Sequence, residues 1–344
     1  MQKRTFFRLY MDIFSLKNWF LEEKRDLPWR KDPSPYAVWI SEVMLQQTQA
    51  AVVIPYYMRW MERFPTLESV AQASSLELIK MWEGLGYYAR IRNFHKAAQA
   101  LTASGKEVPE TREELEALPG LGPYTVGAIL SFAFHQKAAA VDGNVLRVMA
   151  RHEGIEAPIN RGATKKAVEL RVAEILPCEE PWIVMEALIE LGAQMCTKRS
   201  RCELCPIQNS CYAYREGKVL ELPIKDRATP IQKLERHVSL IYFQDLLLVQ
   251  CGASGKLMAD LYEFPYSDTT KSPIEQLGLK VSCRGILDPI SQSFTQFRVT
   301  LYPTCWEAEK ADPVPGFSWM RLEEVCLLPF SSGHRKILEE WRKR

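Results

Sequence analysis

Two carboxylates set among apolar residues are the first candidates for chemistry in this chain. Glu42 lies within VWISEVML (38–45), and Asp142 lies within VDGNV (141–145). Burial of Glu42 would favour its protonated form, which is the form that a general acid needs. An acid followed by glycine just before a new helix is typical of an N-terminal cap, and it can also place a carboxylate beside a bound phosphate backbone. A solvent-exposed glutamate and an ordinary capping aspartate are the alternatives.

A cluster of thiols is the second candidate. Four cysteines are separated in turn by five, two and five residues: Cys196, Cys202, Cys205 and Cys211. One CxxC pair with two outlying cysteines and no nearby histidine favours an iron–sulfur cluster over a zinc ribbon, which has paired CxxC motifs. Zinc stays the alternative. The loop between the first two cysteines contains Lys198, Arg199 and Arg201, so it suits a phosphate group.

Three other side chains could contact a nucleic-acid base, Trp29, Arg30 and Tyr88, and Glu186 is a further candidate for chemistry. Trp29 and Arg30 share a proline-rich loop, where they could stack on a base and hydrogen-bond it, although a tryptophan packed on the core is the commoner case. Tyr88 follows a turn with two glycines and is a candidate wedge or stacking platform. Glu186 is a second carboxylate in an apolar helix.

A glycine hairpin between two helices must position these groups. The sequence LPGLGPYTVGAI (118–129) is too rich in glycine and proline at its start to continue a helix, and a second helix is predicted over residues 124–134. Backbone N–H groups beside Gly120 and Gly122, at the positive end of this helix, suit a phosphate. A common αα-hairpin with an ordinary turn is the alternative.

The remaining elements divide the chain into a helical part and a sheet part. Residues 36–61 are expected to be helical with one interruption near Pro55, and the polar run QQTQ (46–49) on this helix could contact bases in a duplex. A charged, proline-containing linker is predicted over residues 217–235. Residues 236–344 then carry the strand patterns of a small α+β domain.

Composition limits what kind of protein this can be. The 344 residues are 47% hydrophobic and 25% charged, which is typical of a soluble protein with more than one domain. No apolar run reaches the ~18 residues of a membrane span. The net charge of +2 requires any DNA-binding surface to be a local basic face. Nine cysteines, four of them clustered, favour a reducing cytoplasm over a secreted disulfide framework.

Several stretches match one known family: LPWR (27–30), VWISEVMLQQTQ (38–49), GLGYYARIRN (84–93), LPGLGPYTVGAI (118–129) and VDGNVLRV (141–148). With the cysteine cluster, they resemble the adenine-specific mismatch DNA glycosylases of the MutY type. The resemblance covers essentially the whole chain and is stronger before the linker than after it.

The resemblance implies a multidomain fold: an all-α helix-hairpin-helix core with an iron–sulfur cluster loop, plus a C-terminal α+β Nudix-like domain. Its six-helix domain would span residues 29–136. Its cluster domain would combine residues 1–28 and 137–216, with a 4Fe-4S cluster on the four cysteines. The linker (217–235) would lead to a lesion-recognition domain (236–344).

The resemblance also implies a role for each site residue. Glu42 would protonate adenine, and Asp142 would face the sugar with support from Tyr124 and Asn144. The adenine pocket would be lined by Trp29, Arg30, Leu45 and Glu186. The DNA contacts would come from Gln47, Thr48, Tyr88, Gly120, Gly122, Lys198, Arg199 and Arg201.

Two features depart from the family pattern. The first two cluster cysteines are separated by five residues, where the family usually has six. The family's Phe-Ser-His in the C-terminal domain reads Phe294-Thr295-Gln296 here, which are the candidate lesion-recognition residues. The acidic box of Nudix hydrolases is also missing, so this domain is expected to recognise a lesion and not to hydrolyse a nucleotide.

The predicted activity is that of a monofunctional DNA glycosylase. It would act as a monomer on double-stranded DNA, in the cytoplasm at the nucleoid and without a membrane, and would flip and excise adenine mispaired with 8-oxoguanine or guanine. At the hairpin position where bifunctional relatives carry a Schiff-base lysine, this chain has Tyr124. A bifunctional pyrimidine glycosylase/lyase of the endonuclease III type and a catalytically silent damage-binding scaffold are the alternatives.

Overall fold

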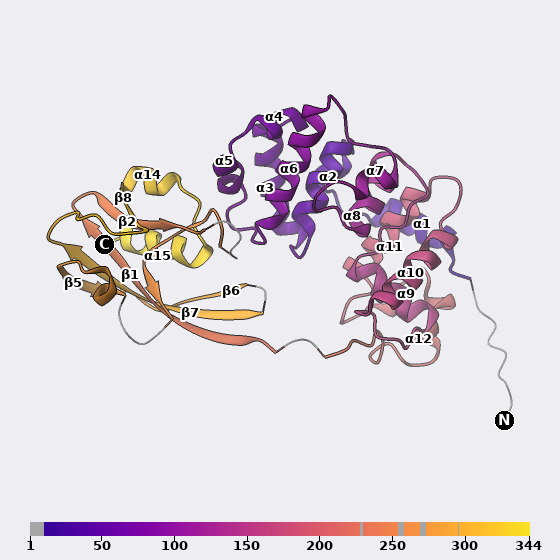
Figure 1. Cartoon of the computed structure of the whole chain (residues 1–344). Helices are drawn as coiled ribbons and strands as arrows, with labels where there is room; N and C mark the ends of the chain where they lie inside the picture. The colour runs from indigo at the N-terminus through magenta and orange to yellow at the C-terminus, as the bar shows by residue number, and fades with distance from the viewer. Residues whose placement is uncertain (1–9, 228–229, 254–257, 269–272, 295) are drawn as a thin grey trace. The chain divides into compact units, whose positions relative to one another are not determined.

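The computed structural model describes residues 10–227, 230–253, 258–268, 273–294 and 296–344. They form two compact units (Figure 1): the described part of Met1–Ala71 with Asn93–Arg227, and Gln72–Arg92 with the described part of Ala228–Arg344. The first unit is helical, and the second contains a mixed sheet. This arrangement confirms the predicted fold class of a helical core with a C-terminal α+β part. The finer domain boundaries stay a prediction.

The first unit consists of helices joined by short loops. Its elements are α1 (Ile13–Glu23), η1 (Pro28–Arg30), α2 (Pro35–Leu45), α3 (Ala50–Arg63), α4 (Leu67–Gln72), α6 (Ala89–Ala103), α7 (Arg112–Glu116), α8 (Pro123–Ala128), η2 (Ile129–Ala133), α9 (Gly143–Glu153), α10 (Gly162–Ile175), α11 (Pro181–Gln194), η3 (Cys202–Leu204), η4 (Gln208–Ser210) and α12 (Tyr212–Arg215). Within the described residues, no helix has the length and apolar character needed to cross a bilayer.

Helix α2 carries Glu42 and ends where the polar run begins. Ser34 caps its N-terminus by accepting a hydrogen bond from the backbone of Ala37, at 3.3 Å, and a proline occupies the first turn. The helix stops at Leu45, and Gln47 adopts a left-handed φ of 60°. The predicted interruption near Pro55 is therefore wrong. The break falls at residues 46–49, while Pro55 lies inside α3.

Aromatic packing fixes α2 in the unit. The Trp39 ring meets Phe94 edge-on with centroids 4.7 Å apart, and Trp60 packs on Phe64 at 4.9 Å. The hydroxyl of Tyr36 accepts a hydrogen bond of 2.9 Å from the Trp60 indole. With nearly every α2 side chain buried, the backbone that carries Glu42 has little freedom to move.

The glycine hairpin is confirmed, with α7 before the turn and α8 after it. Gly120 takes a φ of 85°, which favours glycine, and α8 continues into the π-helical turn η2. A Cβ atom at Gly127 would lie 2.0 Å from the carbonyl oxygen of Ala139, so only glycine permits this close approach. The hairpin thus packs directly against the segment that leads to Asp142.

The second unit contains α5 (Ser75–Met81) and a mixed sheet with strand order β3-β2-β1-β7-β5. Its elements are β1 (Gln232–Phe243), β2 (Leu246–Cys251), β3 (Tyr262–Glu263), β4 (Tyr266–Ser267), α13 (Ile274–Leu277), β5 (Val281–Ile286), β6 (Ile290–Phe294), β7 (Phe297–Ala308), β8 (Ser318–Arg321), α14 (Leu322–Leu327) and α15 (Ser332–Arg342). Strands β1 and β7 are parallel, with Gln232 opposite Phe297, and the other strand pairs are antiparallel.

Alternating side chains build two apolar cores in this unit. Along β2, Leu247 and Val249 join one core, while Leu248 joins the other. Helix α15 covers the first core through Ile337 and Leu338, and α13 contributes partly buried residues to the second. A sheet with both faces covered explains why the strands of this unit are so apolar.

Candidate active site

A pocket of about 930 Å³ in the first unit brings together all the predicted catalytic and adenine-pocket residues and two of the predicted DNA contacts. Those that line it are Trp29, Arg30, Glu42, Leu45, Gln47, Thr48, Tyr124, Asp142, Asn144 and Glu186. They come from η1, the end of α2, the hairpin helix α8, the start of α9 and helix α11. The roles assigned to these residues by resemblance stay predictions, but their shared location is a finding of the structure.

Glu42 is a buried carboxylate with one short hydrogen bond. Its exposed fraction is 5%, and the hydroxyl of Tyr124 donates to Oε2 at 2.7 Å. Burial raises the pKa of Glu42 from its ordinary value of 4.5 to about 7, and the nearby carboxylates act in the same direction, against the Tyr124 hydrogen bond and the charge of Arg30. A carboxyl with this pKa can hold a proton near neutral pH and deliver it to a bound base.

Asp142 caps α9 and faces the same pocket. Its Oδ1 accepts hydrogen bonds from the backbone N–H groups of Asn144 and Val145, at 2.9 and 2.8 Å, so the predicted cap is confirmed. The Asn144 side chain donates to Oδ2 at 2.7 Å. Burial raises the pKa of Asp142, while these hydrogen bonds counteract it. The carboxylate is thus held in one orientation by three donors.

Asn144 is itself fixed by Arg147, a residue that the sequence analysis did not single out. The Arg147 guanidinium donates to Asn144 Oδ1 at 2.8 Å, to the carbonyl of Gly192 at 2.7 Å and to the carbonyl of Cys196 at 2.6 Å. A Cβ atom at Gly192 would lie 2.6 Å from the Asn144 Cβ, so glycine allows α11 to approach α9 here. Asp142 is thereby connected to the first cysteine of the cluster.

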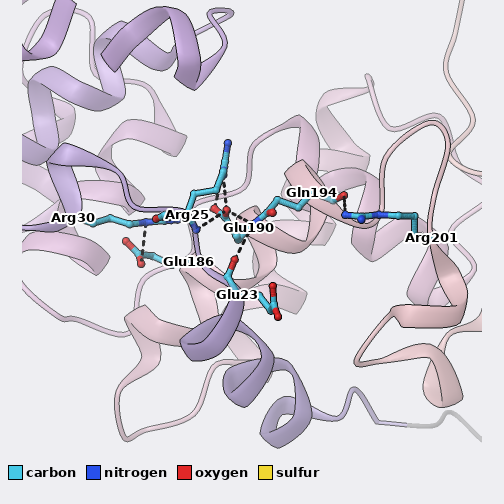
Figure 2. Close-up of polar contacts among 7 residues, drawn as sticks. All are labelled: Glu23, Arg25, Arg30, Glu186, Glu190, Gln194 and Arg201. Carbon is cyan, nitrogen blue, oxygen red and sulfur yellow. Dashed lines mark hydrogen bonds and ion pairs between the residues drawn. The ribbon is translucent and has the colours of Figure 1, made fainter. Parts of the chain in front are cut away.

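The wall of the pocket formed by α11 contains a network of charges (Figure 2). Arg30 Nε lies 3.5 Å from Glu186 Oε2, and Arg30 Nη2 lies 2.9 Å from Glu190 Oε2. Glu190 is fully buried and also binds Arg25 through Nε and Nη2, at 2.5 and 3.0 Å. Burial raises the pKa of Glu186, whereas hydrogen bonds from Arg25 and the charge of Arg30 outweigh burial and lower the pKa of Glu190.

Trp29 and the end of α2 complete the pocket. Trp29 is 7% exposed and packs edge-on against Tyr57 with centroids 5.5 Å apart, so it is a core residue as well as a pocket residue. Gln46 donates to the hydroxyl of Thr125 at 3.2 Å, and the neighbouring Gln47 is exposed. The left-handed backbone at Gln47 turns this residue out of the helix, which places polar atoms at the pocket rim.

The other predicted DNA contacts lie outside this pocket. Gly122 is the N-cap of α8, and a Cβ atom there would meet nothing within 4 Å, so the backbone is open. Lys198, Arg199 and Arg201 are exposed on the cysteine loop. Tyr88 belongs to the second unit, in the turn before α6.

The predicted lesion-recognition residues lie at a hairpin of the second unit. Strand β6 ends at Phe294 and β7 begins at Phe297, so these residues do not form one continuous strand. Gln296 is exposed in the turn, and its carbonyl accepts a hydrogen bond of 2.8 Å from the backbone of Gln232. Thr295 and the side chain of Phe294 lie outside the described residues.

The four cysteines line one narrow cavity, together with Arg151 and His152. Arg151 donates to Cys196 Sγ at 3.4 Å and to the Thr197 carbonyl at 2.7 Å. In the described ranges, no three His, Cys, Asp or Glu side chains lie close enough to share one metal ion. Four cysteine thiols around one cavity are a ligand set that an iron–sulfur cluster can use.

Comparison with known proteins agrees with the helical core described above. The family described as "HhH-GPD superfamily base excision DNA repair protein" matches residues 40–178. The chain is similar to a solved thermostable thymine-DNA glycosylase, with 27% identity and a TM-score of 0.55 over 59% of this chain and 95% of that one. A non-covalent endonuclease III–DNA complex is also similar, with 27% identity and a TM-score of 0.52 over 60% and 94% of the two chains. These likenesses confirm the predicted helical core.

Relatives named adenine DNA glycosylase extend over both units. The Mus musculus protein is 43% identical in an alignment of 395 residues that covers 94% of this chain and 76% of that protein. The Homo sapiens protein is 31% identical, with 95% of this chain and 73% of that protein covered. For the Rattus norvegicus protein, 43% identical, the match covers 61% of this chain and 43% of the relative. This chain therefore belongs to the adenine DNA glycosylase family of base-excision DNA repair enzymes.

Proposed function

We propose that this protein is a monofunctional glycosylase that flips adenine out of duplex DNA, where it is mispaired with 8-oxoguanine or guanine, and hydrolyses its N-glycosidic bond. The observation that carries this proposal is the buried Glu42 in one pocket with Asp142, Glu186 and Arg30. The pocket offers a proton donor, a carboxylate for a developing cation and polar groups for a base. Its volume of about 930 Å³ is ample for a flipped nucleotide.

The two catalytic carboxylates, Glu42 and Asp142, have different roles. Departure of adenine needs a proton on the base, and Glu42 supplies it because burial raises its pKa to about 7, so that a large share of this carboxyl is protonated near neutral pH. The sugar left behind becomes an oxocarbenium ion, and the charge of Asp142 stabilises it, directly or through a covalent intermediate. Tyr124 orients Glu42, and Asn144 orients Asp142, each by a hydrogen bond of 2.7 Å.

The pocket supports simple hydrolysis and not strand cleavage. A lyase needs an amine that forms an imine with the sugar. No lysine is among the described residues that line the pocket, and Tyr124 faces Glu42 from the hairpin. Borohydride trapping with an adenine-containing duplex should therefore leave no covalent protein–DNA product.

The cysteine loop is proposed to hold a 4Fe-4S cluster. Cys196, Cys202, Cys205 and Cys211 would be its ligands, and the bound cluster would supply structural order to the loop. Lys198 and Arg199 are exposed on this loop and would contact DNA phosphates. The hairpin glycines, Gln47, Thr48 and Tyr88 are proposed as further duplex contacts. Solved complexes of endonuclease III with DNA support a duplex as the partner.

The second unit is proposed to read the base opposite adenine. The exposed hairpin tip at Gln296, with Phe294 and Thr295 beside it in sequence, is the proposed reading element. The protein would act as a monomer at the nucleoid in the cytoplasm.

One experiment tests the whole proposal. Duplexes with adenine opposite 8-oxoguanine, guanine or thymine are incubated with excess protein, and released adenine and strand breaks are measured separately. Adenine release from the first two duplexes without strand breaks is the expected result. Release of a pyrimidine base instead, or strand scission without added base, would contradict it.

A further inference from the structure

Three residues one helical turn apart form a polar ridge along α11. Glu186, Glu190 and Gln194 are spaced by four residues, so they share one face of the helix. Figure 2 shows the ridge with Arg30 near Glu186 at one end and Arg201 near Gln194 at the other. Arg201 Nη2 donates to the Gln194 carbonyl at 3.0 Å, which places a cation at the C-terminal end of the helix. The ridge thus runs from the adenine pocket to the cysteine loop.

Glu190 is the middle of this ridge, and its carboxylate is saturated with donors. Oε1 accepts from Arg25 Nε at 2.5 Å and from Gln194 Nε2 at 2.6 Å. Oε2 accepts from Arg25 Nη2 at 3.0 Å and from Arg30 Nη2 at 2.9 Å. A fully buried carboxylate is costly unless it is paired in this way. The presence of a charged residue at this buried position therefore needs an explanation.

The pairing decides where the Arg30 guanidinium lies. Nη1 of Arg30 donates to the backbone carbonyl of Arg25 at 3.1 Å, and Nη2 is bound to Glu190. The contact of Arg30 with Glu186 is longer, with 3.5 Å between Arg30 Nε and Glu186 Oε2. One arginine is therefore divided between two carboxylates, with the buried one holding it more closely.

We propose that Glu190 is a positioning residue of the adenine pocket: it holds Arg30 and keeps this guanidinium from pairing fully with the carboxylates that act on the base. The inference rests on the proposed function, in which Glu186 lines the adenine pocket and Glu42 protonates the base. If Arg30 were released, it would form a closer ion pair with Glu186. This closer pair would offset the negative charge of Glu186, which acts on Glu42.

The consequence is a change in the pH at which Glu42 loses its proton. The groups that act on Glu42 are Tyr124, Asp142, Glu186 and Arg30, and of these the arginine is the cation. The negative charge of Glu186 raises the pKa of Glu42, so a closer pair between Arg30 and Glu186 favours the ionised form of Glu42 and lowers its pKa. Less of the acid form would then be present at neutral pH. The role of Glu190 can thus be read from a pH profile and not only from stability.

The test variant is Glu190→Gln, which keeps the size of the side chain but removes its charge and one acceptor oxygen. Single-turnover adenine release from an A:8-oxoguanine duplex is measured between pH 5 and pH 9. We expect release at pH 7.5 to fall by at least about tenfold, because misplacing a positioned group commonly costs that much. The midpoint at which release declines should move to lower pH, with duplex affinity within about threefold of wild type.

A matched control separates this effect from lost stability. Glu153 pairs with Arg171 at 2.7 Å, and both side chains are largely buried, but neither lines the pocket. Glu153→Gln breaks an ion pair by the same chemical change. It should lower the thermal midpoint of unfolding while leaving both the release rate and its pH midpoint unchanged.

A second variant tests the proposal even if Glu190→Gln does not fold. Arg30→Met removes the cation itself, so its pH midpoint should move upward, opposite to that of Glu190→Gln. In the double variant, the substitution at Glu190 should cause no further change of the midpoint. A wild-type midpoint in both single variants would overturn the proposal.

A readout without activity separates this inference from the proposed function. The carboxyl of Glu42 is titrated by ¹³C NMR in glutamate-labelled protein and assigned with Glu42→Gln. A lower pKa in Glu190→Gln supports the inference, and an unchanged pKa contradicts it. Wild-type protein that releases no adenine from any duplex would refute the proposed function, while the titration would still decide the role of Glu190.

Discussion

Replacing the proposed general acid should make the protein more stable, not less. Glu42 is 5% exposed, and its pKa is raised from 4.5 to about 7, chiefly by burial. In the unfolded chain the carboxyl ionises near 4.5, so the folded state holds its proton more tightly. This contribution favours folding below pH 4.5 and is lost as the pH rises through about 7. Above neutral pH the folded protein therefore contains a costly buried charge.

The size of the effect follows from the two pKa values. Each pH unit between them is worth about 1.4 kcal/mol, so ionising Glu42 in the fold costs on the order of 3 kcal/mol at pH 8 and less than about 1 kcal/mol at pH 5. In Glu42→Gln the amide oxygen can still accept the hydrogen bond from Tyr124, and no charge forms. For a unit of this size the expected rise in thermal midpoint is roughly 6–12 °C at pH 8 and roughly 2–3 °C at pH 5.

The assay is thermal unfolding of wild type and Glu42→Gln from pH 5 to pH 8, with the cluster state matched. Glu156→Gln is the control, because Glu156 is an exposed glutamate whose pKa is lowered by its 2.7 Å hydrogen bond from Lys218. The thermal midpoint of Glu156→Gln should not rise above that of wild type at pH 8. If Glu42→Gln were equally stable or less stable than wild type at both pH values, the reasoning about a buried, protonated carboxyl would be refuted.

Three further predictions concern the other parts of the molecule. Asp142→Asn should abolish adenine release while duplex binding is kept, and methanolysis by the wild type should give the retained anomer if a covalent intermediate forms; an inverted product would exclude that intermediate. Purified protein should be yellow-brown with about four irons per chain, and one zinc without iron would show that the cysteines hold a different metal. Gln296→His should raise the preference for 8-oxoguanine over guanine by about 1 kcal/mol, the scale of one hydrogen bond, whereas an unchanged ratio in Gln296→His and in Gln296→Ala would remove the hairpin tip from lesion reading.

Local signals made much of the site predictable. The acid–glycine pair predicted the cap at Asp142, and the glycine-rich turn predicted the hairpin before Tyr124, because both depend on a few neighbouring residues. The break in the helix after Glu42 lies at residues 46–49 and not at the predicted position near Pro55. Tertiary packing keeps this proline inside α3, while the backbone at Gln47 turns left-handed, and a propensity argument contains neither fact.

Residues that act through distant partners were missed. Glu190 binds an arginine 165 positions away in the sequence, and Arg147 contacts a carbonyl 49 positions away. Nothing in the sequence marks such pairs, although the spacing of Glu190 from Glu186 is a helical repeat that could have identified it. In the second unit, the short polar run ISQSF (290–294) forms β6 by pairing with β7, and its sequence alone does not predict that partner.

The central claim is that Glu42 delivers the proton that releases adenine. Its most direct test is single-turnover release from an A:8-oxoguanine duplex by wild type and by Glu42→Gln, with binding of the duplex measured in parallel. We expect the variant to bind the duplex but to release adenine ~10²–10⁴ times more slowly, which is the usual value of a positioned acid. Release by Glu42→Gln within about tenfold of wild type would contradict it.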